Sequence, residues 1–398
     1  MNILKIIDPK NTINILCPLF LLIYTIIPMV FYFIGVSDLY LLKVSFISCV
    51  SILSIKIGEI AYKVIIGNKI LNLHDKNYYL KDKIFAYFNI YLFIIVFLIL
   101  IFRAESIPII SALKGADAET LSVERGLFMK LQSGFGYFLI YLFSMQISSI
   151  IPYCLTYLYE IKSCFRNPFV IFTLFASVST LVKTMFFNVL IPIFSLKLIS
   201  RNLNDLRIIR YIIIILSTLI FMVSISGFNR ADSDQTSDLD TYFSVGYQSQ
   251  NTFDFITWRL LIIPIIAARD TLIVHDLQYS GNWLMGSTSG VLSKIIGEEK
   301  IDMEREVFNY QYGGMSDIGN TNATFFIDAY VNFGYLGVVL YGFIVAVLFK
   351  TLISSNIKSA IAIAPLFAIF LYGSSLVGIL TSNGFILIFL WLWVRKII

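Results

Sequence analysis

The chain has 398 residues, of which 58% are hydrophobic and only 14% are charged, and its mean hydropathy is +0.82. Because soluble domains are about half apolar and a quarter charged, this composition excludes an ordinary soluble protein. The net charge of +5 is too small to indicate a nucleic-acid partner.

Apolar runs of roughly 18 residues or more are typical of membrane-spanning helices. The runs here are continuous, whereas the strands of a membrane β-barrel alternate apolar and polar residues. The first run is too long for a signal-peptide core and lacks an A-x-A cleavage site, so we expect a retained helix. The predicted fold class is therefore an all-α polytopic membrane protein with about ten transmembrane helices. The candidate segments are 13–35, 40–60, 84–103, 134–158, 168–182, 184–200, 209–227, 329–349, 359–377 and 378–394.

Basic residues set the predicted orientation, because Lys and Arg accumulate on the cytoplasmic side of a membrane. They follow the second, fourth, sixth, eighth and last segments, so both termini are predicted to be cytoplasmic. These residues are Lys63, Lys69, Lys76, Lys81, Lys83, Lys162, Arg166, Lys197, Arg201, Arg207, Arg210, Lys350, Lys358, Arg395 and Lys396.

The stretch 168–200 has basic residues at both ends, so the charge rule requires the chain to enter the membrane and return within it. Two short or broken helices meeting near Lys183 satisfy this requirement, while one long helix would invert every later segment. A lysine within the membrane is costly and marks a functional site, unless it reaches the interface by snorkelling.

The same orientation places two polar loops outside, 104–132 and 228–327. Loops of this length in a compact protein are usually functional. The predicted organisation is N-terminal transmembrane helices in 1–227, a large periplasmic loop in 228–327 and C-terminal transmembrane helices in 328–398.

The large loop opens with "SISGFNRADSDQTSDLDTY", in which Arg230 follows the seventh segment. This arginine is either an interfacial snorkelling residue or an anion ligand, because the guanidinium fork matches phosphate oxygens. Acidic residues outnumber the arginines of this loop, which favours individually placed arginines over a general basic patch.

A second apolar stretch in the loop, "FDFITWRLLIIPIIAARDTLIVHD", is predicted as a membrane-surface or re-entrant helix. If Pro264 does not rotate the two halves of this helix relative to each other, Arg259 and Asp270 share a face, about three turns apart. No ion pair between them is therefore expected. Arg269 lies beside Asp270. His275 is expected to be an ordinary polar residue near the helix end.

After the loop, "YGGMSDIGNTNATFFIDAYVNFGYLGVVLYG" leads back into the membrane. Asp328 and Asn332 lie one turn apart at the start of the predicted helix. Gly334 and Gly337 are expected to let another helix approach closely. Asp328 is either favourably placed at a helix N-terminus or a carboxylate that accepts a proton or holds a sugar hydroxyl. The polar residues before it that could contact a substrate are Asp317, Asn320, Thr321, Asn322 and Thr324.

Other polar groups carry weaker signals. Lys56 and Glu59, three residues apart, are expected to pair. The cysteines lie in or beside apolar runs and the two histidines are far apart, so neither a disulfide framework nor a metal site is predicted.

The topology and the stretches "GFNRAD", "TWRLLIIP", "LMGSTSGVL" and "NATFFIDAYVNFGYLG" resemble the bacterial O-antigen polymerases, the Wzy-type oligosaccharide repeat-unit polymerases. The resemblance covers roughly residues 170–345. It implies a GT-C-like fold in the inner membrane and a metal-independent glycosyltransferase without cofactor. Such enzymes transfer a growing glycan from undecaprenyl diphosphate to the non-reducing end of an incoming lipid-linked unit, beside a chain-length regulator. Their recurring arginines would correspond to Arg230 and Arg259.

The chemistry implied by this resemblance assigns roles to the candidate residues. A departing diphosphate gathers negative charge, so cationic donors should supply the main catalytic contribution. Asp328 and Asp317 are the candidate bases. The predicted diphosphate ligands are Arg230, Arg259, Arg269 and Lys183, and the predicted sugar ligands are Asn320, Asn322 and Thr324.

Three other activities compete with this assignment. A flippase for the same lipid-linked unit should show internal repeats, which the sequence lacks. An O-antigen ligase is expected to carry a His-Asn pair, whereas Thr321-Asn322 or Ala323-Thr324 occupies that place. A membrane acyltransferase would need a catalytic histidine, and His74 lies in a basic cytoplasmic loop.

Overall fold

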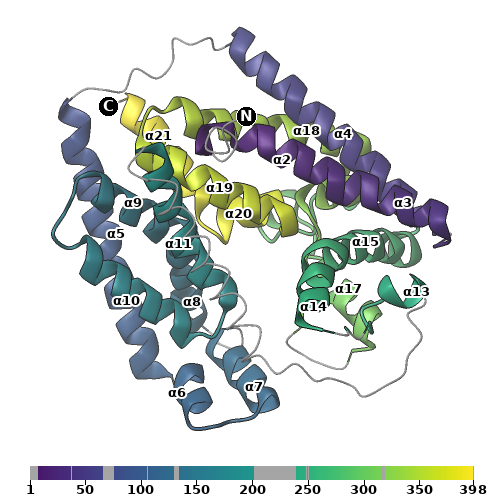
Figure 1. The fold of residues 1–398 in the computed structure, drawn as a ribbon, viewed down its shortest axis with the longest axis horizontal. Helices are drawn as coiled ribbons and strands as arrows, with labels where there is room; N and C mark the ends of the chain where they lie inside the picture. Colours follow the sequence, from purple (N-terminus) through teal and green to yellow (C-terminus); the bar gives the residue numbers. More distant parts are fainter. Residues whose placement is uncertain are drawn as a thin grey trace.

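The computed structural model describes residues 8–36, 38–65, 76–104, 106–129, 134–200, 239–247, 249, 251–314 and 319–397, and in these residues it contains helices and turns but no strand (Figure 1). Five helical runs are long and apolar enough to cross a membrane: Pro9–Ile34, Leu39–Ile65, Leu80–Arg103, Phe135–Glu160 and Phe325–Ser354. Shorter apolar helices cover Thr184–Ile199, Lys358–Gly373 and Phe385–Val394. The prediction of an all-helical multi-pass membrane protein is confirmed. The number of ten crossings stays a prediction, and its segment 209–227 lies outside the described residues.

One helical group is built from the N-terminal hairpin and a late helix. Its first arm is a continuous run of η1 (Pro9–Asn11), α2 (Thr12–Phe20), the π-turn η2 (Leu21–Ile26) and α3 (Ile27–Ile34). The second arm is α4 (Leu39–Ile65), which packs along α18 (Phe325–Ser354). Small residues allow this contact: a Cβ on Gly58 would lie 2.9 Å from Ala346, and one on Gly342 would lie 2.7 Å from Ser54. Small residues at such an interface are what tight packing in lipid requires.

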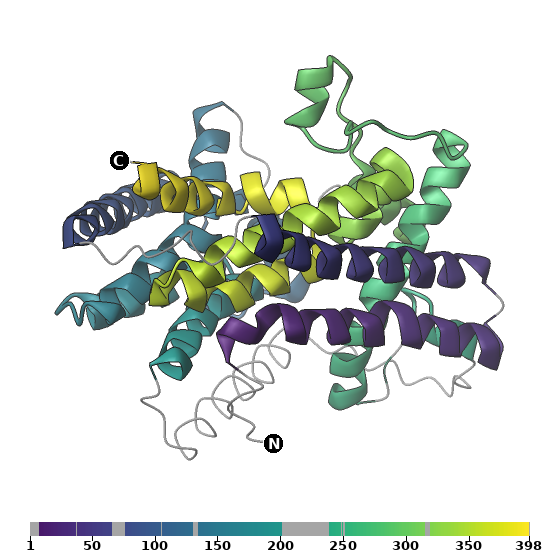
Figure 2. The same ribbon diagram turned by 90° about the horizontal axis from the view of Figure 1, so that it is seen from above.

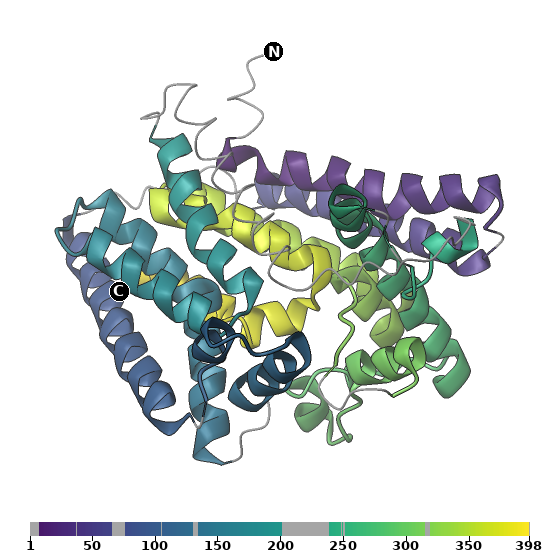
Figure 3. The same cartoon turned by 60° about the horizontal axis from the view of Figure 1, so that its bottom comes forward.

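A second group contains the middle of the chain. It is formed by α5 (Lys76–Arg103), α8 (Phe135–Met145), η4 (Gln146–Ile150), α9 (Ile151–Glu160), α10 (Arg166–Ser179) and α11 (Lys183–Ile199), with α6 (Pro108–Leu113) and α7 (Ala118–Met129) in the first polar loop. Stacked rings of Phe93, Phe97 and Phe143 join α5 to α8. Between the groups lie α19 (Lys358–Gly373), α20 (Leu376–Thr381) and α21 (Phe385–Ile397), drawn in yellow (Figure 3).

The structure divides two predicted membrane stretches, 168–200 and 378–394, into separate helices. The stretch 168–200 is two helices, α10 and α11, which separate at Leu181, whose φ is +53°, so the alternative of one long helix is wrong. The predicted last span, 378–394, is also divided, because α20 ends at Thr381 and Gly384 turns the chain with a φ of +78° before α21 begins. A side chain at Gly384 would contact the Met145 carbonyl at 2.9 Å, so glycine is required both for the turn and for the close approach.

Proline explains the three π-helical turns found in the described residues. Each of η2, η4 and η5 (Trp258–Ile262) is followed two residues later by a proline, respectively Pro28, Pro152 and Pro264. Proline donates no backbone hydrogen bond, and its ring clashes with the carbonyl four residues earlier. A local widening to a π-turn relieves the clash while the helix continues.

The late polar loop is helical and lies against the first group. It contains α13 (Leu239–Tyr242), a run of α14 (Thr252–Thr257), η5 and α15 (Ile263–Tyr279), then α16 (Leu292–Ile296) and α17 (Met303–Tyr312). Figure 2 shows this run crossing the α3–α4 hairpin rather than lying along it. It is not among the helices that could span a membrane, which fits the predicted surface or re-entrant helix.

Helix α18 is bent near its start. Gly334 has a φ of +64° and a ψ of −155°, so the helix consists of a first segment up to Phe333 and a longer one from Tyr335. The bend folds the chain back so far that a Cβ on Gly337 would lie 2.5 Å from the Ala329 carbonyl. Both glycines were expected to admit another helix; instead Gly334 makes the bend, and Gly337 admits the first segment of its own helix.

Replacing Gly334 tests whether the bend requires glycine. Gly334→Ala places a Cβ in the left-handed region and 3.0 Å from the Trp283 ring. We expect a loss of about 1–3 kcal/mol of stability, the usual cost of such a backbone conformation. Thermal unfolding in detergent measures it. Gly373→Ala is the matched control, since that position is open and no steric cost arises; equal Tm values for the two variants would contradict the assignment.

Candidate functional site

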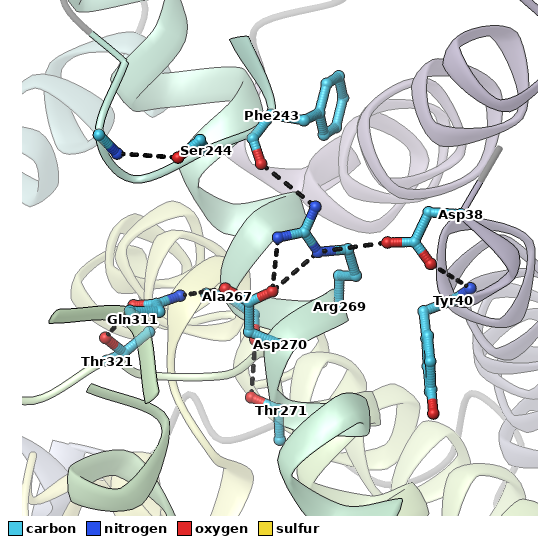
Figure 4. Close-up of polar contacts among 11 residues, drawn as sticks. Asp38, Tyr40, Phe243, Ser244, Ala267, Arg269, Asp270, Thr271, Gln311 and Thr321 are labelled. Carbon is cyan, nitrogen blue, oxygen red and sulfur yellow. Dashed lines mark hydrogen bonds and ion pairs between the residues drawn. The ribbon is translucent and has the colours of Figure 1, made fainter. Parts of the chain in front are cut away.

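Arg269 fixes the crossing helix α15 to the turn that joins α3 and α4 (Figure 4). Its Nη2 and Nε lie 2.7 and 2.8 Å from Asp270 Oδ1, and its Nε lies 3.6 Å from Asp38 Oδ2, in the turn between α3 and α4. Nη1 donates to the carbonyl of Phe243 at 3.2 Å. The guanidinium is thus balanced by two carboxylates. Its position is that of a structural clamp, and its predicted role as a diphosphate ligand stays a prediction.

The second oxygen of Asp270 extends the contacts to the end of the loop. Gln311 Nε2 on α17 donates to Asp270 Oδ2 at 2.7 Å, and Thr321 Oγ1 donates to Gln311 Oε1 at 2.7 Å. Burial is the largest influence on Asp270 and raises the pKa of its carboxyl, while Arg269 and Gln311 act against that rise. The chain from Asp38 to Thr321 therefore links the membrane hairpin to the segment that precedes α18 (Figure 4).

A second ion pair holds the far end of α15. Lys43 Nζ on α4 lies 3.0 Å from Asp276 Oδ2, and it also faces the rings of Tyr40 and Tyr330 at 5.5 and 5.3 Å. Burial works to raise the pKa of Asp276, but the hydrogen bond and charge of Lys43 outweigh it and the pKa is lowered. Two charged contacts, one on either side of the α4 N-terminus, thus position α15.

His275 lies near the end of α15, as expected, but it is buried, which the sequence did not indicate. Its Nε2 lies 2.9 Å from the Asn282 carbonyl and its Nδ1 lies 3.4 Å from Asp276 Oδ1. The imidazole stacks on Trp283 with centroids 6.1 Å apart. It joins the end of α15 to the loop that follows.

That loop binds the bent part of α18. The amides of Leu284 and Met285 donate to the carbonyls of Val331 and Asn332 at 3.1 and 3.0 Å. These carbonyls lie just before the bend at Gly334, where the regular helical pattern is interrupted. The loop "LMGSTSGVL" therefore satisfies backbone groups that the bend leaves without a helical partner.

Asp328 lies in a polar cluster at this junction. Its Oδ1 accepts hydrogen bonds from Thr288 Oγ1 at 2.9 Å and from Asn332 Nδ2 at 3.1 Å, and Asn332 Oδ1 accepts one from the Gly286 amide. The Asp328 side chain is partly exposed, and its Oδ2 makes no hydrogen bond with the described residues. The cluster orients Oδ1 and leaves Oδ2 without a hydrogen bond to the described residues.

Arg259 lies on the π-turn η5, at the start of the crossing run. Its side chain is exposed and makes no ion pair or hydrogen bond in the described part of the chain. The adjacent Leu260 carbonyl, which lies four residues before Pro264, accepts a hydrogen bond from the Tyr372 hydroxyl of α19. The Tyr372 carbonyl in turn accepts from Tyr24 at 2.6 Å. Pro264 cannot donate to the Leu260 carbonyl, so α19 supplies the missing hydrogen bond through Tyr372. This bond holds the turn that carries Arg259 against α19.

The remaining predicted site residues are distributed as follows. Arg230 and Asp317 lie outside the described residues. Lys183 begins α11 at the break after α10, and its side chain also lies outside the described part. Asn320 and Asn322 are exposed on the segment before α18. Thr324 precedes the first residue of α18 and is buried.

Sequence reasoning missed Asp38, Thr288, Gln311 and Tyr372, and it gave Lys43 only as a weak candidate, a charge within the second predicted span. Each is an isolated polar residue whose partner is remote in the chain, so no local pattern marks it. Pro264 is the one signal within the sequence that indicated an irregular turn near Arg259. Among the described residues, no group of three or more His, Cys, Asp or Glu side chains is arranged to hold a metal ion.

Comparison of the chain with models of known protein families, with curated proteins and with solved structures gives no match.

The two arginines of α15 and its preceding turn make a matched pair for mutation. Arg269→Gln leaves the buried Asp270 without its cation, for which we expect a loss of about 3–5 kcal/mol of stability. Arg259→Gln removes an exposed side chain, for which we expect a change within about 0.5 kcal/mol. Thermal unfolding in the same detergent compares them. Similar destabilisation by both substitutions would contradict the assigned clamp.

The Lys43–Asp276 pair predicts a pH dependence of stability. Because the pKa of Asp276 is lowered from its ordinary value of 3.8, the pair contributes fully above that value and its contribution is lost as pH falls through the lower folded pKa. We expect Asp276→Asn to lower Tm at pH 6 and to lose this deficit at acid pH. A difference in Tm that stays constant from pH 6 to pH 3 would contradict the pairing.

Proposed function

We propose that the chain is a GT-C-like, metal-independent glycosyltransferase of the bacterial inner membrane, with ten spans and both termini in the cytoplasm. It polymerises undecaprenyl-diphosphate-linked oligosaccharide units at the periplasmic face. The observation that carries the proposal is the exposed guanidinium of Arg259 on a turn that Tyr372 pins to the membrane helices. An uncommitted cation at the rim of a bilayer suits a lipid-borne anion.

The proposed step is displacement at an anomeric carbon. The acceptor hydroxyl of the incoming unit forms a bond to the anomeric carbon of the growing glycan. The bond from that carbon to the diphosphate oxygen breaks, and the electron pair leaves with undecaprenyl diphosphate. The proton of the acceptor passes to a base. Charge that develops on the leaving diphosphate is stabilised by a preoriented cation, which is the role given to Arg259.

Asp328 is the base in this proposal. Support comes from its hydrogen bonds: Thr288 and Asn332 hold Oδ1, and Oδ2 makes no hydrogen bond with the described residues. Thr288, which contacts Asp328, lies in the loop that follows α15, and Arg259 lies in the turn that precedes α15. The contact of His275 with the Asn282 carbonyl joins α15 to that loop. Asn320 and Asn322 are exposed on the segment before α18, where they can contact the sugars of a bound unit.

The four predicted diphosphate ligands differ in whether carboxylates of the protein already balance their charge. Arg269 faces two carboxylates, so its charge is largely used within the protein, and Arg259 carries the greater share of diphosphate binding. Arg230 and Lys183 keep their proposed roles. A chain-length regulator remains the proposed protein partner.

Chain growth in vesicles tests the proposal. With purified protein and lipid-linked repeat units, we expect Arg259→Ala to slow polymerisation roughly 10- to 100-fold, because a charge-assisted hydrogen bond is worth about 1.5–3 kcal/mol. Asp328→Asn keeps the side-chain shape and should slow polymerisation about 10²- to 10⁴-fold.

Asp302→Asn, at an exposed carboxylate of the same loop, is the control and should leave the polymer ladder unchanged. Transbilayer movement of the lipid-linked unit without polymer would favour a flippase. Normal ladders from both Arg259→Ala and Asp328→Asn would refute the proposal.

A further inference from the structure

Three lysines converge on one carboxylate at the end of the α4–α18 pair that is remote from α15. Lys350 Nζ and Lys63 Nζ lie 2.7 and 3.5 Å from Glu59 Oε1, and Lys56 Nζ lies 3.3 Å from Glu59 Oε2. The predicted Lys56–Glu59 pair is thus confirmed as part of a larger cluster, which we call the lysine cluster: Lys56, Glu59, Lys63 and Lys350.

The lysine cluster has an excess of positive charge. Three ammonium groups face one carboxylate, which leaves two positive charges without a described counter-ion. The further contact of Lys56 is with the neutral amide oxygen of Asn14 on α2, at 2.9 Å. Each ammonium offers three donors, so the cluster retains donors for an additional anion.

The surroundings of Lys56 are those of a lipid-facing surface. The neighbouring side chains of Leu53, Ile57 and Ile60 are 62, 63 and 61% exposed, and the Lys56 side chain is 39% exposed. Lys56 lies nine residues before the end of α4, about 13 Å along a helix. A lysine at such a position extends toward the headgroup level, where its charge is less costly.

We propose that Lys56, Lys63 and Lys350 bind the phosphate group of an anionic phospholipid. Basic sites between transmembrane helices are suited to anionic headgroups, and the exposed Leu53 and Ile57 can contact the acyl chains of the same molecule. Glu59 holds the three ammonium groups together and offsets part of their repulsion when no lipid is bound. This site is separate from the proposed glycosyltransferase site and does not depend on it.

Native mass spectrometry of the full chain in detergent tests the site, with phosphatidylglycerol, phosphatidylcholine and inorganic phosphate as probes. We expect tight binding of phosphatidylglycerol and weak binding of phosphatidylcholine, whose headgroup has no net charge. Excess inorganic phosphate should not displace the lipid, because it makes no acyl contacts. Displacement by phosphate, or equal binding of the two lipids, would overturn the proposal.

Matched variants make the test specific. The double variant Lys56→Gln/Lys63→Gln keeps the short Lys350–Glu59 pair and should weaken phosphatidylglycerol binding about 30-fold, roughly fivefold for each lysine. Glu59→Gln removes the competing carboxylate and should strengthen binding. Lys294→Gln, exposed on α16, is the control and should change nothing. If Glu59→Gln does not fold, the double variant decides, and an affinity equal to that of the control would overturn the proposal.

Discussion

The pairing of Arg269 with Asp270 and Asp38 is the interaction on which the position of α15, and of the segments packed against it, depends. A guanidinium that is mostly removed from water requires carboxylates to balance it, and here one comes from its own helix and the other from the α3–α4 turn. These contacts, together with the Lys43–Asp276 pair, hold α15 against the hairpin. The loop after α15, α17 and the start of α18 are then all placed relative to α15.

Backbone chemistry provides the second constraint. Pro264 leaves the Leu260 carbonyl without its helical donor, and Tyr372 supplies the missing hydrogen bond. Gly334 interrupts α18, and the amides of Leu284 and Met285 bind the carbonyls before the bend. In both places an irregular helix is completed by a remote segment, and in both places a candidate site residue, Arg259 or Asp328, lies beside it. A helix without these irregularities would need neither partner.

The sequence predicted those features that depend on residues close together in the chain, and it did not predict contacts between remote residues. The apolar runs identified the long helices, and the charges around 168–200 indicated the break that Leu181 now shows. The three-residue spacing of Lys56 and Glu59 indicated their pair, but Lys350 joins them from 291 residues away. The clamp at Arg269 could not be predicted, because Asp38 and Gln311 reach it only through the tertiary fold. The regular-helix spacing between Arg259 and Asp270 did not anticipate the π-turn that intervenes.

The central proposal is that the exposed Arg259 binds a lipid diphosphate, and a binding titration tests it most directly. Purified protein would be titrated with a short-chain polyprenyl diphosphate and with the corresponding monophosphate, using wild type and Arg259→Gln. The account predicts that wild type prefers the diphosphate by about tenfold or more, consistent with one charge-assisted hydrogen bond, and that Arg259→Gln loses this preference. Equal affinity of wild type for the two lipids, or an unchanged preference in Arg259→Gln, would contradict it.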